Sequence, residues 1–336
     1  MLQAFLLEPK TIEIREVKPP DPEDGEVLIS VRSALTCGTD LKAYLRGHPL
    51  IPMPGPFGHE FSGIIAAKGK KVKGFKEGDE IMAVHTAPCM RCRYCKKRLY
   101  NLCEDIMNTK VLGAFSEYLL LPSQIVKWNL YHKPKGLTFE EAALLEPLSC
   151  VVHGLRLVRP KRDDLVLIIG AGAIGLLHLL LLKEKGLKVA ITSRKKEKLE
   201  MARQLGADLA VEAYHLDSAL KDFTVGLGVD IVIECTGQLE VWKNSINYVR
   251  RGGTVILFGG VKSGTEVCYD THRLHYDEIN VRGVFHFTPE DVKKTVETLE
   301  GIKASPLITD RLPLVEITSA FEKLSRGEGL KYAIIP

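Results

Sequence analysis

An uncharged and largely apolar run at residues 165–182 constrains the fold more than any other part of this sequence. Its length is close to that of a membrane-spanning helix. It opens, however, with a Val/Ile-rich stretch typical of strands, and it also contains Gly170, Gly172, Gly175 and His178. These features predict a buried strand, a tight turn and a buried helix rather than a membrane span.

The glycines of this run follow the pattern G-x-G-x-x-G. In dinucleotide-binding folds the first glycine permits a tight turn, the second lets the backbone approach a pyrophosphate, and the third lets the helix pack on the strand. Free N–H groups at the helix start favour the phosphates. A glycine-rich turn can also serve plain packing. The strand before it, and the helix and second strand after it, favour a dinucleotide site at Gly170, Gly172, Ala173, Ile174 and Gly175.

From the strand before this turn, strands and helices alternate to about residue 287. We expect strands at 165–170, 188–193, 229–235 and 253–259, with helices at 173–186 and 195–206. Alternation of this kind predicts a parallel, doubly wound sheet.

The regions on either side have a different character. Residues 1–145 are rich in glycine and proline and contain short alternating strands, which predicts an irregular and mostly antiparallel β domain. Residues 288–336 carry one helix that starts near Pro289 and another at about 317–325. They are too few for a domain, and we expect them to pack back on the first region. The chain of 336 residues thus divides into 1–145, a dinucleotide-binding domain at 146–287, and this return segment.

The composition fits a globular protein, with 45% apolar and 26% charged residues. Lysines and arginines number 46 against 42 aspartates and glutamates, and the net charge of +4 is too small for nucleic acid to be the main partner. The first residues lack the cationic start, apolar stretch and cleavage site of a signal peptide. We therefore expect a cytoplasmic protein with neither a membrane nor a nucleic acid as partner.

Four of the eight cysteines stand close together, in the order Cys89, Cys92, Cys95 and Cys103. Four thiolates satisfy tetrahedral zinc and leave no open position, which marks a structural site. An iron–sulfur cluster and buried free thiols are alternatives, and a basic zinc loop could also touch nucleic acid. Zinc is favoured because iron–sulfur motifs usually come with further cysteine sets.

The residues after the second strand of the alternating region indicate which dinucleotide is bound. An acidic residue there would hold the ribose hydroxyls of NAD and repel a 2′-phosphate. The sequence is instead Ser193-Arg194-Lys195-Lys196, whose hydroxyl, guanidinium and ammonium groups suit a phosphate dianion. An ordinary basic helix start with solvated charges is the alternative. The pattern favours NADP, with NAD as the second choice.

Three further residues indicate a function only when they are considered together: Cys37 in Cys-Gly-Thr-Asp, His59 in Gly-His-Glu, and Glu146 in Glu-Pro-Leu-Ser. Singly, each has an ordinary structural interpretation. With the four cysteines and the glycine turn, they make the chain resemble the zinc-dependent medium-chain alcohol dehydrogenase family, most closely its sorbitol dehydrogenase-like polyol branch. The resemblance covers essentially the whole chain. It implies an α/β protein with a GroES-like, mostly β catalytic domain and a Rossmann cofactor domain.

The resemblance also implies a catalytic zinc held by Cys37, His59 and Glu146, with the fourth position open to water or substrate. Glu60 matches an adjacent carboxylate that ligates or exchanges at the metal. Asp40 matches an acid that orients the histidine ligand, which a metal-bound imidazole usually requires. The expected content is two zinc ions per chain, one catalytic and one structural.

Two more residues are assigned by the same resemblance. Thr39 matches the hydroxyl that relays the substrate's proton, and Lys331 matches a basic residue that reaches the pyrophosphate. The histidine that completes the relay in some alcohol dehydrogenases is replaced by Lys42 here, and His48 is out of register. The sequence therefore leaves the exit route of the proton unassigned.

The implied activity is hydride transfer between a secondary hydroxyl of a polyol, sugar alcohol or cyclitol and NADP or NAD. Ser193-Arg194 departs from most polyol enzymes, which use NAD, and resembles NADP-using secondary-alcohol enzymes of the same family. L-Threonine 3-dehydrogenase and a simple secondary-alcohol dehydrogenase are alternatives. An alternative of another class is a non-catalytic NADPH-binding sensor. The resemblance further implies a homodimer or homotetramer.

Overall fold

The computed structural model describes all 336 residues and divides them into two compact units. The first unit comprises residues 1–150 and 287–336, and the second unit comprises residues 151–286. The boundaries expected from the sequence, at 145/146 and 287/288, lie near these limits. None of the helices combines the length and the apolar character that a bilayer span requires.

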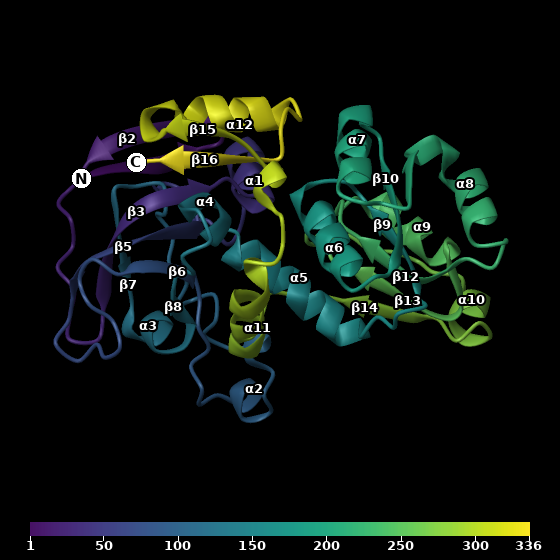
Figure 1. The fold of residues 1–336 in the computed structure, drawn as a ribbon, viewed down its shortest axis with the longest axis horizontal. Coiled ribbons are helices and arrows are strands. Elements are labelled where there is room, and N and C mark those ends of the chain that lie inside the picture. The colour runs from purple at the N-terminus through teal and green to yellow at the C-terminus, as the bar shows by residue number, and fades with distance from the viewer. The chain divides into compact units, whose positions relative to one another are not determined.

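The second unit is built on a six-stranded parallel sheet with the strand order β11-β10-β9-β12-β13-β14. Its strands are β9 (Leu165–Ile169), β10 (Lys188–Ser193), β11 (Leu209–Glu212), β12 (Val229–Glu234), β13 (Val249–Leu257) and β14 (Asn280–Gly283). Its helices lie on both faces of the sheet (Figure 1) and are α6 (Ala173–Glu184), α7 (Lys196–Gln204), α8 (Leu216–Phe223), α9 (Leu239–Asn244) and α10 (Thr271–His275). The expected doubly wound parallel sheet is confirmed.

The apolar run that opens this unit is buried because a parallel sheet is covered on both faces. Val166 and Ile168 of β9, and Val189 and Ile191 of β10, are fully buried. The strand order reverses between β9 and β12, which are neighbours in the sheet although β10 and β11 come between them in the chain. In open sheets of this type, ligands bind at the carboxyl ends of the strands at such a reversal.

The first unit contains a small sheet, β2-β1-β4, and a larger mixed sheet in the order β15-β16-β3-β5-β6-β8, with β7 also paired to β3. Its strands are β1 (Leu2–Glu8), β2 (Thr11–Glu16), β3 (Val27–Leu35), β4 (Gly55–Pro56), β5 (Glu60–Lys68), β6 (Glu80–Val84), β7 (Tyr118–Leu121), β8 (Leu130–His132), β15 (Ile308–Pro313) and β16 (Lys331–Ile335). The core includes the rings of Phe57, Phe61, Phe115 and Phe321. Because β16 pairs with β3, the return segment lies within the sheet of this unit.

Helix α11 of the first unit begins at a clear sequence signal. α11 starts with a capping box, in which the Thr288 hydroxyl accepts from the N–H of Asp291 and the Asp291 carboxylate accepts from the N–H of Thr288. The helices are α1 (Gly38–Arg46), α2 (Arg93–Lys96), α3 (Ser123–Asn129), α4 (Phe139–Ala142), α5 (Leu145–Val158, which runs on into the second unit), α11 (Pro289–Leu299) and α12 (Ile317–Ser325). Single 3₁₀ turns lie at Tyr100–Leu102, Ala213–His215, Ser245–Asn247, Ser305–Leu307 and Leu314–Glu316.

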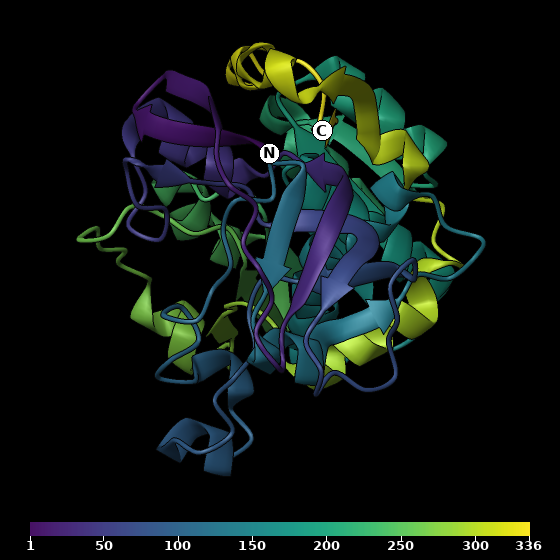
Figure 2. The same cartoon turned by 90° about the vertical axis from the view of Figure 1, so that its left-hand side faces the viewer.

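The register of the mixed sheet brings distant parts of the sequence to one edge. Glu60, the first residue of β5, lies opposite Leu35 at the end of β3 and opposite Val84 at the end of β6. The segments that follow β3 and β6 therefore meet the start of β5. The loop around α2, by contrast, projects away from the sheet, as Figures 1 and 2 both show.

Candidate metal and cofactor sites

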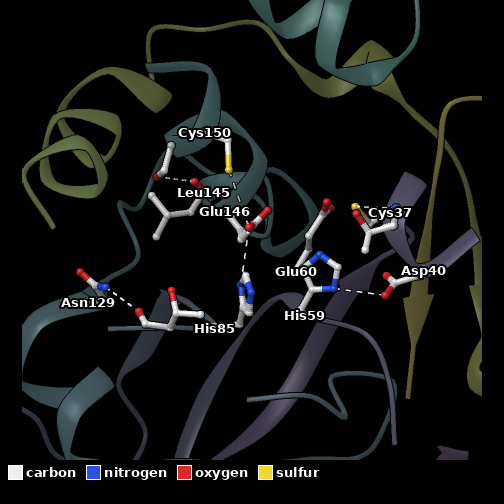
Figure 3. A network of polar contacts seen from close by, with 12 residues as sticks. Cys37, Asp40, His59, Glu60, His85, Asn129, Leu145, Glu146 and Cys150 are labelled. Carbon is white, nitrogen blue, oxygen red and sulfur yellow. Dashed lines mark hydrogen bonds and ion pairs between the residues drawn. The ribbon is translucent and has the colours of Figure 1, made fainter. Parts of the chain in front are cut away.

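A cluster of metal-ligating side chains lies at this edge of the mixed sheet (Figure 3). The ligand atoms of Cys37, His59 and Glu60 all lie within 4.8 Å of one another. Cys37 caps α1, and its Sγ accepts from the backbone N–H of Thr39 at 3.5 Å. Ligand atoms on a tetrahedral zinc ion lie about 3.5 Å apart, so small side-chain movements would bring this group onto one ion.

Asp40 fixes the imidazole ring of His59. The Asp40 carboxylate is fully buried, and its Oδ1 lies 3.1 Å from His59 Nδ1, which leaves Nε2 to face a metal. Burial lowers the pKa of His59, but the charges of Asp40 and Cys37 outweigh it, so that the pKa of His59 lies well above its usual value. Burial and the Glu60 carboxylate raise the pKa of the Cys37 thiol. The contact with Asp40 therefore holds the imidazole in the orientation that a metal ligand needs.

Glu60 forms a buried ion pair with Lys331, which is 3% exposed. The Lys331 ammonium also donates to the carbonyl oxygen of Thr36 at 3.1 Å. Burial raises the pKa of Glu60 above its usual value, although Lys331 and His59 act in the opposite direction. Its second oxygen, Oε1, is buried without a hydrogen-bond partner. A buried carboxylate oxygen without a partner is costly, and a bound cation would remove that cost.

The sequence resemblance assigned Lys331 to the pyrophosphate of the cofactor, whereas its ammonium is held by Glu60 in this structure. The pyrophosphate role stays a prediction. Sequence reasoning did not anticipate the ion pair, because the two residues lie 271 positions apart in the chain.

Glu146 lies in the first turn of α5 and faces a residue that the sequence interpretation missed, His85. Glu146 Oε1 lies 3.5 Å from His85 Nδ1 and 3.9 Å from the Sγ of Cys150. Burial raises the pKa of Glu146 to about 7. The compact group with Cys37 and His59 contains Glu60 rather than Glu146. The predicted role of Glu146 as a zinc ligand stays a prediction.

His85 follows β6 directly, and its ring centroid lies 4.8 Å from that of His59. In the sequence, only its position directly after β6 could have indicated that His85 belongs to the site. That position is informative only once the register of β5 and β6 is known, because the register places Val84 opposite Glu60.

The donor set of the cluster suits a divalent cation. One thiolate and one carboxylate would neutralise it, and the imidazole would add a neutral third ligand. Burial raises the pKa values of Cys37, Glu60 and Glu146. A cation among these groups would favour their charged forms. The first unit can therefore hold a metal ion at this edge of its sheet.

The four cysteines of the projecting loop form a second candidate metal site. Their sulfur atoms lie within 4.8 Å of one another, with 4.0 Å between Cys89 and Cys95 and 3.9 Å between Cys92 and Cys103. A tetrahedral zinc ion would separate its sulfur ligands by about 3.8 Å. Disulfide bonds are excluded because they require about 2 Å. The backbone N–H of Cys95 lowers the pKa of Cys92 to about 6, which favours the thiolate that binds metal.

The glycine turn of the second unit has the geometry of a phosphate cradle. Gly170 has a φ angle of +110°, and a Cβ atom on it would lie 2.9 Å from Cγ2 of Thr236. A Cβ atom on Gly175 would collide with the carbonyl oxygen of Gly170. A Cβ atom on Gly172 would meet no other atom within 4 Å, so the start of α6 lies open. The turn thus requires its first and third glycines and leaves space beside the second for a ligand.

The residues that were predicted to select the dinucleotide lie at the end of β10. The Ser193 hydroxyl accepts from the N–H of Lys195 at 3.2 Å, and Arg194 is exposed. An acid that the sequence interpretation missed ends the neighbouring strand. Glu212 lies beside Ser193 in the sheet register, and its carboxylate lies 3.6 Å from the ammonium of Lys196. Lys196 therefore offsets the charge of Glu212 at this end of the sheet.

Comparison with known proteins shows the family of this chain. Residues 23–130 match the model of the alcohol dehydrogenase GroES-like domain, and residues 173–301 match that of the zinc-binding dehydrogenase. A D-arabinitol dehydrogenase 1 of Uromyces fabae is 32% identical over 100% of this chain and 97% of its own length. A sorbitol dehydrogenase of Halalkalibacterium halodurans is 30% identical over 96% of this chain and 95% of its own length.

Solved structures share the fold of the whole chain. A zinc-binding dehydrogenase of Sinorhizobium meliloti 1021, solved bound to NADP, has a TM-score of 0.90 and 28% sequence identity, and the match covers 100% of this chain and 99% of that one. The expected GroES-like and Rossmann domains are thereby confirmed. The chain belongs to the zinc-dependent medium-chain alcohol dehydrogenase family and is an oxidoreductase of its sorbitol dehydrogenase-like, polyol branch.

Proposed function

We propose that this chain is an NADP-preferring dehydrogenase that oxidises a secondary hydroxyl of a polyol, sugar alcohol or cyclitol and, in reverse, reduces the ketone. The observation that carries the proposal is the compact group of half-buried Cys37 and buried His59 and Glu60. It lies in a chain whose relatives include sorbitol and D-arabinitol dehydrogenases. Three ligands at one point leave a fourth position for a substrate oxygen.

Each residue near the cluster has a defined role in this proposal. Cys37, His59 and a carboxylate would hold a catalytic zinc ion, and the four cysteines of the projecting loop would hold a structural one. The catalytic ion, when bound, supplies the Lewis acidity that favours loss of the hydroxyl proton. Asp40 keeps the imidazole of His59 in place. Thr39, half-buried in the first turn of α1, accepts the hydroxyl proton and passes it on.

The carboxylate ligand is either Glu60 or Glu146, and zinc content can distinguish them. We propose Glu60 as the resident ligand, because it belongs to the compact group and has an unpartnered buried oxygen. Glu146 would exchange with it, since His85 lies against its carboxylate. Glu60→Gln should lower the bound zinc from about two ions per chain to about one, whereas Glu146→Gln should keep most of the second ion. The opposite pattern would make Glu146 the resident ligand.

For the cofactor, we propose that the pyrophosphate lies at the glycine turn and that Ser193 and Arg194 contact the 2′-phosphate of NADP. The open space beside Gly172 supports the first assignment. The absence of an acid after β10 supports the second, as does the NADP bound to the Sinorhizobium meliloti relative. The pyrophosphate contact of Lys331 stays part of the proposal only as the resemblance implies it, since the Lys331 ammonium pairs with Glu60 in this structure.

Initial rates of the zinc-loaded protein test the proposal, measured on polyols, cyclitols, simple secondary alcohols and L-threonine with NADP and NAD in parallel. Strong turnover of a polyol with NADP is the expected result. A clear preference for NAD would contradict the phosphate pocket but not the zinc chemistry. Turnover of L-threonine alone would establish the threonine 3-dehydrogenase alternative. NADPH binding without turnover of any substrate would establish the sensor alternative.

We also propose that the enzyme works in the cytoplasm as a homodimer or homotetramer, as the enzymes it resembles do. Sedimentation velocity of the zinc-loaded protein tests the assembly. A single monomeric species across the micromolar range would contradict it.

A further inference from the structure

Glu234, the last residue of β12, carries a buried carboxylate that has no role in the metal or cofactor binding proposed above. It is fully buried, and no lysine, arginine or histidine forms an ion pair with it. Its Oε1 instead accepts from the Thr236 N–H at 2.6 Å, from the Thr236 hydroxyl, and from the Gly237 N–H at 3.1 Å. A buried carboxylate that accepts these hydrogen bonds from one loop favours a single conformation of that loop.

The main chain of Glu234 holds a second loop. The N–H groups of Phe258 and Gly259, which follow β13, donate to the Glu234 carbonyl oxygen at 3.0 and 2.9 Å. A Cβ atom on Gly259 would lie 2.8 Å from Glu234 Oε2 and would collide with the Gly237 nitrogen. The two loops, residues 235–238 and 258–260, are therefore packed backbone against backbone.

The tryptophan of α9 joins these loops from the other side. Trp242 donates its indole N–H to the Gly259 carbonyl oxygen at 2.8 Å. The Thr236 hydroxyl in turn accepts from the N–H of Gln238 at 3.2 Å. Each loop is thus fixed both by Glu234 and by a side chain from the start of α9 or the turn before it.

These loops flank the point where the strand order of the sheet reverses. β12 lies next to β9, and a Cβ atom on Gly170 would lie 2.9 Å from Thr236 Cγ2. A dinucleotide that binds at this reversal places its pyrophosphate on the turn after β9. Its adenosine half then lies toward β10 and its nicotinamide half toward β12 and β13.

We propose that Glu234 is a positioning residue for the nicotinamide half of the dinucleotide. Its carboxylate fixes Thr236 and Gly237, on which the loop of residues 258–260 packs, and these two loops form the surface for the nicotinamide ribose. The inference rests on the proposed use of NADP or NAD. A carboxylate suits this task because it only accepts hydrogen bonds, and the Thr236 N–H, the Thr236 hydroxyl and the Gly237 N–H that contact it are all donors. A glutamine at this position would present an NH₂ group to at least one of those donors.

The test compares a whole cofactor with its adenosine half in the zinc-loaded protein. Glu234→Gln should raise the Kd of NADPH, followed by its fluorescence, about tenfold, which corresponds to the loss of one charge-assisted hydrogen bond. The Kd of 2′,5′-ADP should change by less than about twofold, because that ligand lacks the nicotinamide half. Polyol KM and zinc content should stay unchanged, while kcat falls.

A second pair of variants covers the case in which Glu234→Gln fails to fold. Thr236→Val removes a hydroxyl donor to Glu234 and should weaken NADPH more than 2′,5′-ADP, whereas Thr236→Ser keeps the hydroxyl and should bind both ligands normally. Equal weakening of both ligands, or no weakening, would overturn the inference and leave the proposed function intact. If the unaltered protein binds neither NADPH nor NADH, the proposed function is wrong and the inference fails with it.

Discussion

Acidification should destabilise the second unit through one residue, His178 of α6. The side chain is fully buried, and its Nδ1 donates to the carbonyl oxygen of Ile174 at 3.0 Å. Its ring lies edge-to-face against Phe258 at 4.8 Å, and its Nε2 has no hydrogen-bond partner. Protonation would place an unpaired charge on Nε2 among apolar groups. Burial accordingly lowers the pKa of His178 to about 4.

The pKa shift sets both the size and the direction of the effect. A histidine in the unfolded chain has a pKa of about 6.5, so the unfolded state binds more protons than the folded state between pH 6.5 and pH 4. Stability is therefore unaffected above about pH 6.5 and falls as the pH drops through this window. A difference of about 2.5 pKa units corresponds to about 3 kcal/mol of unfolding free energy lost by pH 4.

Tryptophan fluorescence gives a direct assay, because the chain has only two tryptophans, Trp128 in the first unit and Trp242 in the second. In a Trp128→Phe background, urea unfolding between pH 4 and 8 reports the second unit. His178→Leu should remove about 3 kcal/mol of pH dependence relative to this parent. The exposed His215 serves as the control, and His215→Ala should keep the parent profile. If the parent and His178→Leu follow parallel curves below pH 6.5, the reasoning is refuted.

Three further predictions concern the metal and cofactor sites. Cys92→Ser should lower bound zinc from about two ions per chain to about one and reduce the Tm, measured by metal analysis and calorimetry. Gly175→Ala should abolish NADPH binding without loss of zinc, because its Cβ atom would collide with the Gly170 carbonyl oxygen; calorimetric titration with NADPH checks this. Glu212→Gln should tighten NADPH binding about two- to fivefold and leave NADH nearly unchanged, because it frees Lys196 from its ion pair; an equal effect on both would contradict that explanation.

Local patterns allowed part of the fold to be predicted closely. β10 spans Lys188–Ser193 and α12 spans Ile317–Ser325, as the sequence indicated. The strand β14, Asn280–Gly283, was not predicted, because it has a single apolar residue and is mostly exposed. Its conformation depends on its pairing with β13, which is a tertiary interaction.

The candidate sites, too, divide into those that local sequence patterns predict and those that depend on tertiary pairing. The four cysteines and the glycine turn are contiguous in sequence, so spacing alone indicated their chemistry. Cys37 and His59 lie on separate segments, and only the pairing of β3 with β5 brings them together. The ion pair of Glu60 and Lys331 depends on the pairing of β16 with β3. Sequence spacing contains no information about either pairing, so a resemblance had to supply the catalytic set.

The position of β16 between β15 and β3 also sets an order of events during synthesis. The second unit is one continuous segment, residues 151–286, and can fold on the ribosome as soon as that segment has emerged. The mixed sheet of the first unit lacks an interior strand until residues 331–335 have been made. Until then Glu60 has no Lys331 beside it. A ribosome that stops before this strand would therefore release a chain with a formed cofactor unit and an unfinished metal centre.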